Sequence, residues 1–512
     1  MKKQLFIITM LIFIGLSTKA QTTFQKTYGQ TYDNVGYSVQ QTTDGGYIIG
    51  GCTSNLGWDE ENVYLIRTNS FGDTIWTKTF GGTAVDQGFS VMQTTDAGYV
   101  IAGTANSFEP FGDVYLVKTN VNGDTLWTKT YGGPNSDAGN AVQQTTDGGF
   151  IIAGSTSSFG VTVENVYLIK TDVNGDAMWT RTFGGSGFDY DEAYSVQQTT
   201  DGGYIIVGKT TSFGAGYYDV YLIKTDDNGD LIWSKTFGGM NDDYGMSVKQ
   251  TTDGGYIIAG YTKSFGAGNY DVYLIKVNAN GNMLWSKTFG GPNIDVGNAV
   301  QQTTDGGFII AGSTEENVYL IKTDVNGDML WSKTFTGFDV ADGKSIQQTT
   351  DGGYIISGRT NVLVYLIKTD SNGNSGCFEG NFNTTQENPA TQVMNPATQV
   401  YSGGFVTSPY TIVNSGCTVV TLCTSIGIDE HTIESDISIY PNPFTSIITI
   451  AFNEEQRKAT IKVMDLLGKE IRIINFTGQL LIIEKGEMSN GIYFFQIIDE
   501  KKNVVNKKIV IQ

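Results

Sequence analysis

The sequence predicts an all-β protein whose main part is a seven-bladed β-propeller. A Thr-Thr-Asp marker occurs seven times, with its aspartates 46 to 54 residues apart. Each repeat also contains four short runs of β-forming residues separated by turn residues. Four antiparallel strands in a repeat of this length are typical of a propeller blade. The marker aspartates are Asp44, Asp96, Asp147, Asp201, Asp253, Asp305 and Asp351.

The third repeat shows how the sequence builds one blade. Its four runs read "GNAVQQT", "GFIIAGST", "NVYLIKT" and "AMWTRTF". Residues 147–149 link the first two runs, and residues 172–176 link the last two. Both links contain Asp-Gly or Asn-Gly, which tolerate positive φ in tight hairpins. The third run is apolar on both faces, which indicates a strand covered by a neighbouring sheet on each side.

The N-terminal residues predict how the ring of blades closes. "FQKTYG" at 24–29 aligns with the fourth run "WTKTFG" at 76–81, although it precedes the first marker. The last repeat provides three runs and lacks the fourth. We therefore expect the N-terminal strand to complete the last blade, because a closed ring leaves fewer interfaces exposed.

Two positions of the fourth run are conserved in type among the repeats. A basic residue is predicted to charge the outer edge and so discourage aggregation, with ligand binding as the alternative; it is Lys26, Lys78, Lys129, Arg181, Lys235, Lys287 or Lys333. An aromatic residue is predicted to pack between blades; it is Phe24, Trp76, Trp127, Trp179, Trp233, Trp285 or Trp331.

The remaining segments complete the domain organisation. Residues 1–20, with a basic end and a short apolar run, predict a secretory signal peptide. Residues 21–370 form the propeller, and residues 371–428 are expected to be a Thr/Asn/Gly-rich linker. Short alternating runs in 429–512 predict a small C-terminal β-sandwich. No later apolar run is long enough for a transmembrane helix.

Composition restricts the function classes. The chain has 52 acidic and 32 basic residues, a net charge of −20 that disfavours nucleic acid and anionic membranes as partners. Its one histidine, His431, leaves the propeller without a Ser-His-Asp triad or an imidazole metal site, which disfavours an enzyme. Cys52 is expected to be a buried thiol, whereas two of Cys377, Cys417 and Cys423 could pair.

A repeated Asp-x-Asn-Gly-Asp turn raises the possibility of calcium. Asp172, Asn174 and Asp176 offer oxygen atoms at alternate positions, as a hard cation requires. The chain returns to an apolar strand immediately afterwards, and other repeats replace the first aspartate by Asn69 or Asn278. We therefore expect hairpin turns, and we predict neither a metal site nor a cofactor, with calcium as the alternative.

Candidate ligand contacts lie where the repeats differ. The connections between second and third runs, and between fourth and next first runs, are long, varied and rich in aromatic and acidic residues. Such loops on a rigid scaffold suit recognition of a glycan or peptide; unconstrained drift is the alternative. The candidate set is Trp58, Asp59, Phe111, Asp189, Tyr190, Asp191, Tyr217, Tyr218, Asp242, Asp243, Tyr244 and Tyr270.

Three functions remain open from the sequence. The first is a secreted or cell-surface binding platform for a glycan, a peptide or a matrix partner. The second is a carboxylate-dependent glycoside hydrolase or lyase that uses Asp191 or Asp243 on the variable face. The third is a structural component of an extracellular coat.

One resemblance concerns the repeat itself. "DVYLIKTDDNGDLIWSKTFGG" at 219–239 resembles the blade repeat of quinoprotein-type propellers. The resemblance covers only the third and fourth runs, and the cofactor-binding residues of those enzymes have no match here. It therefore implies the fold and not the chemistry.

A second resemblance concerns the C-terminal segment. Four motifs occur in order: "YPNP", "MDLLGKEI", "MSNGIYFF" and "KKIVIQ". The segment resembles the type A C-terminal sorting domain of the type IX secretion system of Gram-negative bacteria. The resemblance implies export across the outer membrane, the type IX machinery as partner, and release or anchoring at the cell surface. The motif residues are Tyr440, Pro441, Asn442, Pro443, Gly468, Gly491, Tyr493, Lys507 and Lys508.

Overall fold

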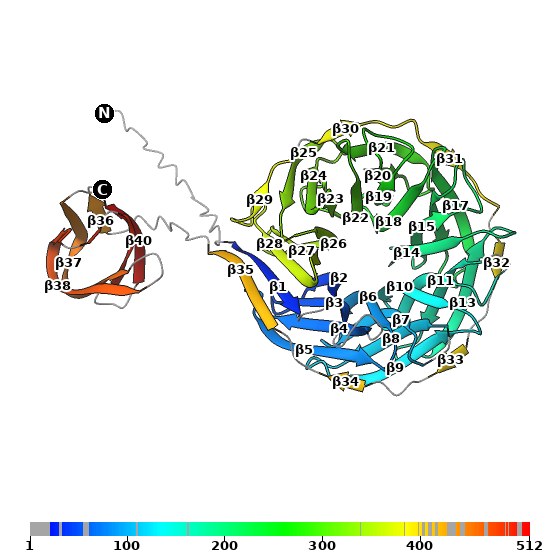
Figure 1. Ribbon diagram of the computed structural model, residues 1–512, viewed down its shortest axis with the longest axis horizontal. Helices are drawn as coiled ribbons and strands as arrows, with labels where there is room; N and C mark the ends of the chain where they lie inside the picture. Colours follow the sequence, from blue (N-terminus) through cyan, green and yellow to red (C-terminus); the bar gives the residue numbers. More distant parts are fainter. Residues whose placement is uncertain are drawn as a thin grey trace, which may run out of the picture. The chain divides into compact units, whose positions relative to one another are not determined.

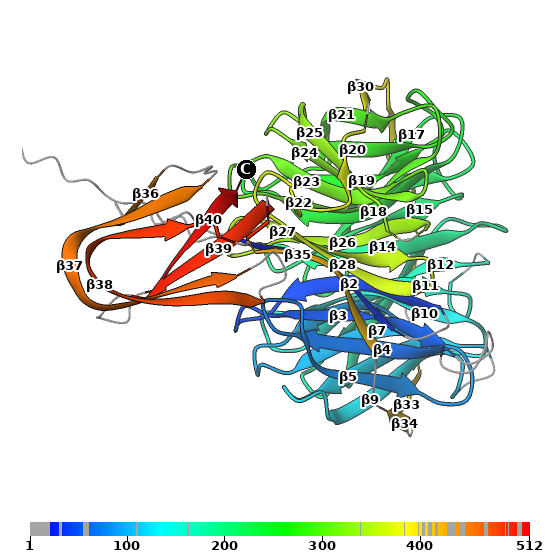
Figure 2. The ribbon, with the colours of Figure 1, turned by 60° about the vertical axis from the view of Figure 1, so that its left-hand side comes forward.

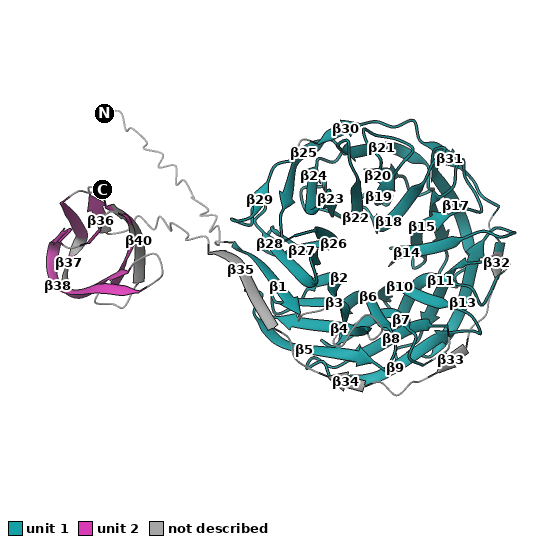
Figure 3. Cartoon of the chain, in the orientation of Figure 1, with its two compact units in different colours: residues 1–427 teal, residues 428–512 magenta. Residues whose placement is uncertain are grey.

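The chain divides into two compact units, residues 1–427 and residues 428–512 (Figure 3). The computed structural model describes residues 21–511 except 30–32, 55–60, 109–110, 161–162, 338, 383, 398, 402–404, 408–411, 415–417, 427–436, 441–445, 465–468, 487, 490 and 499–503. The predicted signal peptide and the motif residues Pro441, Asn442, Pro443 and Gly468 lie outside the described residues. The described residues form strands and turns and no helix.

The first unit consists of seven antiparallel sheets that follow one another along the chain. We number them one to seven and call the whole the seven-sheet unit. In order, their first four strands are β2 (Asn34–Gln41), β3 (Tyr47–Ser54), β4 (Glu61–Thr68) and β5 (Thr74–Gly81); β6 (Asp86–Gln93), β7 (Tyr99–Ala105), β8 (Asp113–Thr119) and β9 (Thr125–Gly132); β10 (Asp137–Gln144), β11 (Phe150–Thr156), β12 (Asn165–Thr171) and β13 (Ala177–Gly184); β14 (Asp191–Gln198), β15 (Tyr204–Thr210), β16 (Asp219–Thr225) and β17 (Leu231–Gly238); β18 (Asp243–Gln250), β19 (Tyr256–Thr262), β20 (Asp271–Val277) and β21 (Met283–Gly290); β22 (Asp295–Gln302), β23 (Phe308–Thr314), β24 (Asn317–Thr323) and β25 (Met329–Phe335); and β26 (Ala341–Gln348), β27 (Tyr354–Thr360), β28 (Leu363–Thr369) and β1 (Thr22–Gly29).

The predicted pairing of the N-terminal strand with the last sheet is confirmed. β1 pairs antiparallel with β28, with Phe24 opposite Lys368. The innermost strand of each sheet contacts the following sheet, and β2 of sheet one contacts β26 and β27 of sheet seven. Figure 1 shows the seven sheets arranged radially, with their first strands nearest the centre.

A fifth strand extends each sheet, and all seven come from the segment that was expected to be a linker. The short strands β29 (Glu379–Gly380), β30 (Thr385–Glu387), β31 (Gln392–Met394), β32 (Gln399–Tyr401), β33 (Phe405–Thr407) and β34 (Ile412–Asn414) pair with the fourth strands of sheets six, five, four, three, two and one. β35 (Thr418–Ile426) then pairs with β1 of sheet seven. The strands β29 to β35 therefore follow one another around the unit against the chain order, and each covers the fourth strand of one sheet (Figure 1).

The basic residue of the fourth strand consequently does not charge an open edge, which corrects the sequence interpretation. In five sheets it forms an ion pair with an aspartate of the next sheet's turn: Lys26–Asp73, Lys78–Asp124, Lys129–Asp176, Arg181–Asp230 and Lys287–Asp328, at 2.6 to 3.5 Å. Lys235 instead donates to Asn395, because the corresponding turn residue is Asn282. The five ion pairs join neighbouring sheets.

The aromatic residues of the fourth strands pack between sheets, as predicted. Trp76 of sheet one meets Tyr99 of sheet two edge-on, with ring centroids 5.7 Å apart. Phe24 takes the seventh place and contacts Tyr47 in the same way, at 6.1 Å. Each tryptophan also lies against the glycine of the next sheet's third-to-fourth turn; Gly123, with φ of 77°, has no room for a Cβ beside Trp76.

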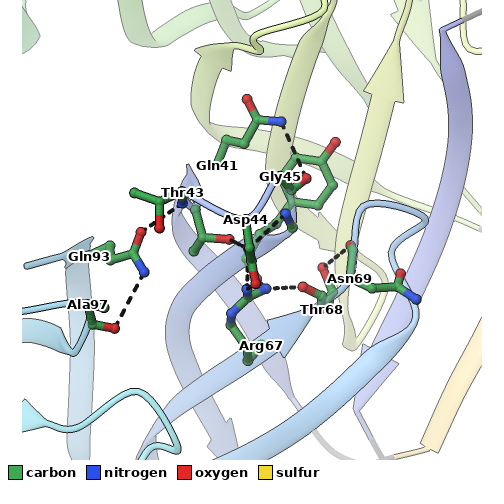
Figure 4. A network of polar contacts seen from close by, with 12 residues as sticks. Gln41, Thr43, Asp44, Gly45, Arg67, Thr68, Asn69, Gln93 and Ala97 are labelled. Atoms are coloured by element: carbon green, nitrogen blue, oxygen red, sulfur yellow. Dashed lines mark hydrogen bonds and ion pairs between the residues drawn. The ribbon is translucent and has the colours of Figure 1, made fainter.

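The Asp of each Thr-Thr-Asp marker holds the turn between the first two strands (Figure 4). Asp44 accepts hydrogen bonds from the Thr42 hydroxyl at 2.7 Å and from the Arg67 guanidinium at 2.6 Å. Burial opposes ionisation of Asp44, but these bonds outweigh it and lower its pKa. The N–H of Thr43 donates to Gln93 of the next sheet at 2.9 Å, so the turn also joins two sheets.

The second unit is a single bent sheet, whereas the sequence predicted a β-sandwich. Its strands are β36 (Ile437–Tyr440), β37 (Ile447–Met464), β38 (Glu470–Glu484), β39 (Gly491–Ile498) and β40 (Val504–Ile511). β37 pairs with β36 and β39 on one edge and with β38 on the other, with register shifts between Ala451 and Ala459. These irregularities bend the sheet into a half-barrel, so that both ends of β37 line the same apolar core (Figure 2).

Buried carboxyl pairs predict a pH-dependent stability. Burial, together with the charge of Asp243, raises the pKa of Asp219 to about 6. Because the pKa is raised on folding, the stabilising contribution is present at low pH and is lost as pH rises through about 6. We expect Asp219→Asn to be more stable than wild type by roughly 2 kcal/mol near neutral pH, with the difference vanishing near pH 4. Urea unfolding followed by tryptophan fluorescence measures this, because all seven tryptophans lie in the seven-sheet unit.

The third sheet provides the matched control for this prediction. Asn165 stands where Asp219 stands, beside Asp191. Asn165→Asp should therefore introduce the same loss of stability with rising pH. Equal pH profiles for wild type and both variants would contradict the assignment.

The structure also predicts one disulfide pairing. Cys377 is disulfide-bonded and Cys52 is a buried free thiol, which leaves Cys417 and Cys423 as possible partners. The Gln25 amide donates to the carbonyl of Cys377, and the β1–β35 register places the backbone of Cys423 opposite Gln25. We expect non-reducing peptide mapping to find Cys377 linked to Cys423. A peptide that links Cys377 to Cys417 would contradict this.

Candidate functional site

The candidate site lies on one face of the seven-sheet unit. We call this the loop face; it is built by the connections from second to third strands and from fourth to next first strands. The tight turns from first to second and from third to fourth strands form the opposite turn face. In sheets four and five the loop face carries residues 211–218, 239–242, 263–270 and 291–294.

The structure separates the predicted contact residues into four groups. Trp58 and Asp59 lie outside the described residues. Phe111, Asp189, Tyr190 and Tyr217 are at least partly exposed, and Tyr217 is 76% exposed. Tyr218, Asp242, Tyr244 and Tyr270 are half-buried and gather in one cluster, whereas Asp191 and Asp243 are fully buried.

The burial of Asp191 and Asp243 removes them from the contact set. Asp191 accepts a hydrogen bond from the Ser212 hydroxyl at 2.6 Å, and Asp243 accepts one from Ser264 at 2.7 Å. Three other sheets have the same aspartate at the start of their innermost strand, Asp86, Asp137 and Asp295. These carboxyl groups tie the strand to the following loop. Burial raises their pKa values, as expected for groups withdrawn from water.

A tyrosine cluster forms where sheets four and five meet. Tyr244 and Tyr261, directly opposite in β18 and β19, stack with ring centroids 4.6 Å apart. Tyr218 approaches Tyr244 at 5.3 Å, and Tyr270 meets Tyr261 edge-on at 5.5 Å. The hydroxyl of Tyr270 donates to Asp242 at 3.2 Å. Loops 211–218 and 263–270 thus bring their aromatic residues onto aromatic residues of the strands.

Lys209 joins this cluster to the neighbouring carboxylate. Its Nζ lies 4.8 Å from the ring centroid of Tyr218, 5.6 Å from that of Tyr194 and 5.7 Å from that of Tyr244. It also forms an ion pair with Glu192 at 3.1 Å, and the Tyr194 hydroxyl donates to the same carboxylate at 2.7 Å. Cation–π attraction and the ion pair therefore fix the ammonium group among the rings.

Burial keeps the hydroxyl groups of the cluster protonated. It raises the pKa of Tyr261 to about 12 and also raises the pKa values of Tyr194, Tyr244 and Tyr270. Burial raises the pKa of Glu164 as well, and the charge of nearby Glu192 adds to that rise. At neutral pH the tyrosines are therefore neutral, and their rings can stack against a ligand. The hydroxyl protons of Tyr194 and Tyr270 are already donated to Glu192 and Asp242.

A groove of about 700 Å³ adjoins the cluster. It is lined by Asn269, Pro292, Asn293, Ile294, Glu315, Glu316 and Asn317. Asn269 directly precedes Tyr270, whose backbone bridges to Ile294. The side chain of Asn293 donates to Glu315 at 2.6 Å. The groove therefore offers amide and carboxylate groups beside an apolar wall, next to the aromatic rings.

The sequence interpretation missed the residues of the cluster that lie within strands. Tyr194, Lys209, Tyr261 and Glu192 are such residues. Glu192 of β14 lies opposite Lys209 of the adjacent strand β15. Tyr244 lies opposite Tyr261 at the equivalent position of the next sheet. The remaining sheets have Val35–Cys52, Gln87–Thr104, Ala138–Ser155, Val296–Ser313 and Asp342–Arg359 at this pair. Comparing the repeats position by position within the strands would have revealed this variation.

The first side chain of the repeated Asp-x-Asn-Gly-Asp turn closes the turn by hydrogen bonds. Oδ1 of Asp172 accepts hydrogen bonds from the backbone N–H groups of Asn174 and Asp176, at 2.8 and 2.9 Å. The side chain thus closes the turn itself. Over the part of the chain that the structure describes, no group of three or more histidine, cysteine or acidic side chains converges on a metal-sized site.

Comparison with known proteins concerns mainly the second unit. Residues 438–512 match the family described as "Secretion system C-terminal sorting domain". An endo-acting ulvan lyase of Formosa agariphila is 31% identical over 90 residues, which is 17% of each chain. The chain thus matches less than one-fifth of the length of that curated relative.

Solved structures give only distant matches. PorZ, described as a surface component of the type-IX secretion system of Porphyromonas gingivalis, aligns with a TM-score of 0.40 and 10% identity, over 93% of this chain and 59% of that one. Sqt1 from Chaetomium thermophilum aligns with a TM-score of 0.42 and 9% identity, over 69% of this chain and 99% of that one. Matches at this level support no conclusion about function.

The second unit is thus a secretion-system sorting domain joined to an all-β unit of seven sheets. The predicted sorting function is confirmed, and the protein is a secreted or outer cell-surface protein handled by the secretion machinery. Among the sorting-motif residues, Tyr493 is buried in the core of the bent sheet and Tyr440 is half-exposed. Within the described residues, no helix is long and apolar enough to span a membrane.

Lys209 is expected to hold the cluster together. Lys209→Met removes the cation between three rings and leaves the Glu192 carboxylate without its positive partner, and both side chains are only about one-fifth exposed. We expect the free energy of unfolding to fall by about 3 kcal/mol. The double variant Lys209→Met/Glu192→Gln should recover part of the loss, because the unpaired charge is gone. Urea unfolding measures both, and additive losses would show that the pair does not interact.

Proposed function

We propose that the seven-sheet unit is a closed seven-bladed β-propeller that binds a carbohydrate on its loop face. The observation that carries the proposal is the adjacency of the tyrosine cluster and the groove beside Tyr270. Closure is supported by β1 pairing with β28 and by the contact of β2 with sheet seven. The resemblance to quinoprotein-type propellers supports the fold alone and contributes no cofactor to the proposal.

The chemistry of this surface suits a sugar. Tyr217, Phe188 and Tyr190 are exposed on the loop face, and aromatic faces pack against the C–H face of a sugar ring. Asn293, Glu315 and Asn317 provide donors and acceptors for hydroxyl groups within the groove. The ulvan lyase acts, by its name, on a polysaccharide, which makes glycans the first ligand class to test.

The main argument for the hydrolase or lyase alternative no longer holds. It relied on Asp191 and Asp243, which are buried and hydrogen-bonded in the loop-face framework. No specific observation favours the coat alternative over binding. We therefore propose a non-catalytic platform that the sorting domain delivers to the cell surface or the medium.

Binding to immobilised polysaccharides tests the proposal. The full chain should be retained on at least one member of a polysaccharide panel. Tyr217→Ala and Tyr270→Ala should each weaken retention by about tenfold, since each removes one aromatic contact of roughly 1–1.5 kcal/mol. The control is Phe71→Ala, which removes an aromatic residue of the turn face that is 51% exposed.

Two results would count against this function. Absence of retention on neutral and acidic polysaccharides alike would contradict carbohydrate binding. Retention that falls equally in Phe71→Ala would place the ligand elsewhere on the molecule. Circular dichroism of each variant verifies that the fold is intact.

A further inference from the structure

The innermost strands carry polar side chains at one shared register position. The positions are the seventh residues of the seven first strands, which Figure 1 shows closest to the centre. Five are glutamines, one is a methionine and one is a lysine: Gln40, Gln143, Gln197, Gln301, Gln347, Met92 and Lys249. All seven side chains are half-buried.

Each glutamine of this ring is held by the next sheet. Oε1 of Gln40 accepts a hydrogen bond from the backbone N–H of Gln93 at 2.6 Å. The same bond recurs for Gln143, Gln197, Gln301 and Gln347, at 2.5 to 2.7 Å. Gln347 of sheet seven bonds to Gln41 of sheet one, so the ring of bonds continues across the junction between the two ends of the unit.

In these five glutamine side chains, the NH₂ donors remain without a partner among the described residues, while each Oε1 atom already accepts one hydrogen bond. A backbone N–H can only donate, so the amide atom that faces it must be the oxygen. Each glutamine therefore keeps its NH₂ group for other partners, and no donor bond from these five Nε2 atoms to another described residue is present. The ring presents up to ten N–H donors, two for each amide, and no unused acceptor except the second lone pairs of Oε1.

Lys249 cannot form the bond that the glutamines form, so the contact between sheets five and six lacks one hydrogen bond. An ammonium group has no acceptor, so the N–H of Gln302 lacks the bond that its counterparts receive. Met92, the other exception, still accepts weakly from the N–H of Gln144 through Sδ at 2.9 Å. Within the described residues Lys249 has neither an ion pair nor a hydrogen bond, and burial lowers its pKa. Burial therefore disfavours the ammonium form of Lys249, and the surrounding N–H donors offer it no acceptor, so an anion held among them would stabilise the charged form.

We propose that this ring, with Lys249 as its charged member, is a binding site for an oxyanion such as a sulfate, phosphate or carboxylate group. Charge-assisted N–H···O bonds from an ammonium and several amides are what such a group requires. A cation would meet the same charge and the same N–H donors, which oppose it. The site is separate from the loop-face cluster, and its existence does not depend on carbohydrate binding there.

The oxyanion can be a free inorganic ion or an acidic group of a larger ligand. Titration calorimetry of the full chain with sodium sulfate, sodium phosphate and sodium glucuronate, each at constant ionic strength in sodium chloride, distinguishes the two sources. We expect binding of at least one of these anions with about one site per chain. Binding of the inorganic ions indicates a free anion, and binding of glucuronate alone indicates a sugar acid.

Lys249→Gln is the decisive variant, because five sheets already have glutamine at this position. It should fold as well as wild type or better, since the new amide can accept the N–H of Gln302. It should bind the anion at least about tenfold more weakly, as expected from the loss of one charged hydrogen-bonding partner. Lys458→Gln, an exposed lysine of the second unit, makes the same change of net charge and should bind as wild type does.

Two outcomes would overturn the proposal. One is the absence of heat of binding for all three anions in the wild-type chain. The other is equal binding by wild type and Lys249→Gln, or equal loss in Lys458→Gln, either of which would indicate a nonspecific effect of charge. A thermal midpoint of Lys249→Gln at or above that of wild type confirms that weakened binding does not result from unfolding.

Discussion

The structure depends on one constraint: the sheets of the first unit are apolar on both faces, so each must be covered by a neighbour on both sides. Val220 and Leu222 of β16 pack in one cluster and Tyr221 and Ile223 of the same strand in the adjacent one. A row of such sheets would leave two apolar faces in water, at about 25 cal/mol for each Å². Contact between sheet seven and sheet one removes both faces at once.

The same constraint explains which residues the repeats preserve. The tryptophan of the fourth strand, the glycine of the following turn and the Lys–Asp ion pair all lie at the contact between sheets. Polar bonds between sheets, such as Thr43 to Gln93, fix the spacing of the turns. Because these contacts are formed on the turn face and in the strands, the loops of the other face are free to differ. Variation is therefore concentrated on the loop face.

The outer strands cover the sheet edges that the fourth strands would otherwise expose. Each four-stranded sheet would expose the N–H and C=O groups of its fourth strand to other chains. The strands β29 to β35 pair with these groups in all seven sheets, and Cys377, shortly before β29, is disulfide-bonded. An exported chain gains from this arrangement, because outside the cell it is exposed to proteases and to other β-rich surfaces.

The sequence alone determined the repeats, the strands within them, the tight turns and the role of the N-terminal strand. These features are local: Asp-Gly and Asn-Gly turns, alternating runs and the matching of 24–29 with 76–81 depend on neighbours in the chain. The sorting motifs were equally readable, because they are short and ordered.

Only the tertiary structure decided what the polar residues do. Asp191 is buried where the fold places Ser212 beside its carboxylate. The three aromatic rings around Lys209 come from two different sheets. The outer strands are two to nine residues long and show no alternation of polar and apolar residues that would predict them. They are strands because they pair with the fourth strands of the sheets. Contacts between residues far apart in the chain fix these roles, and such contacts exist only once the seven sheets have packed.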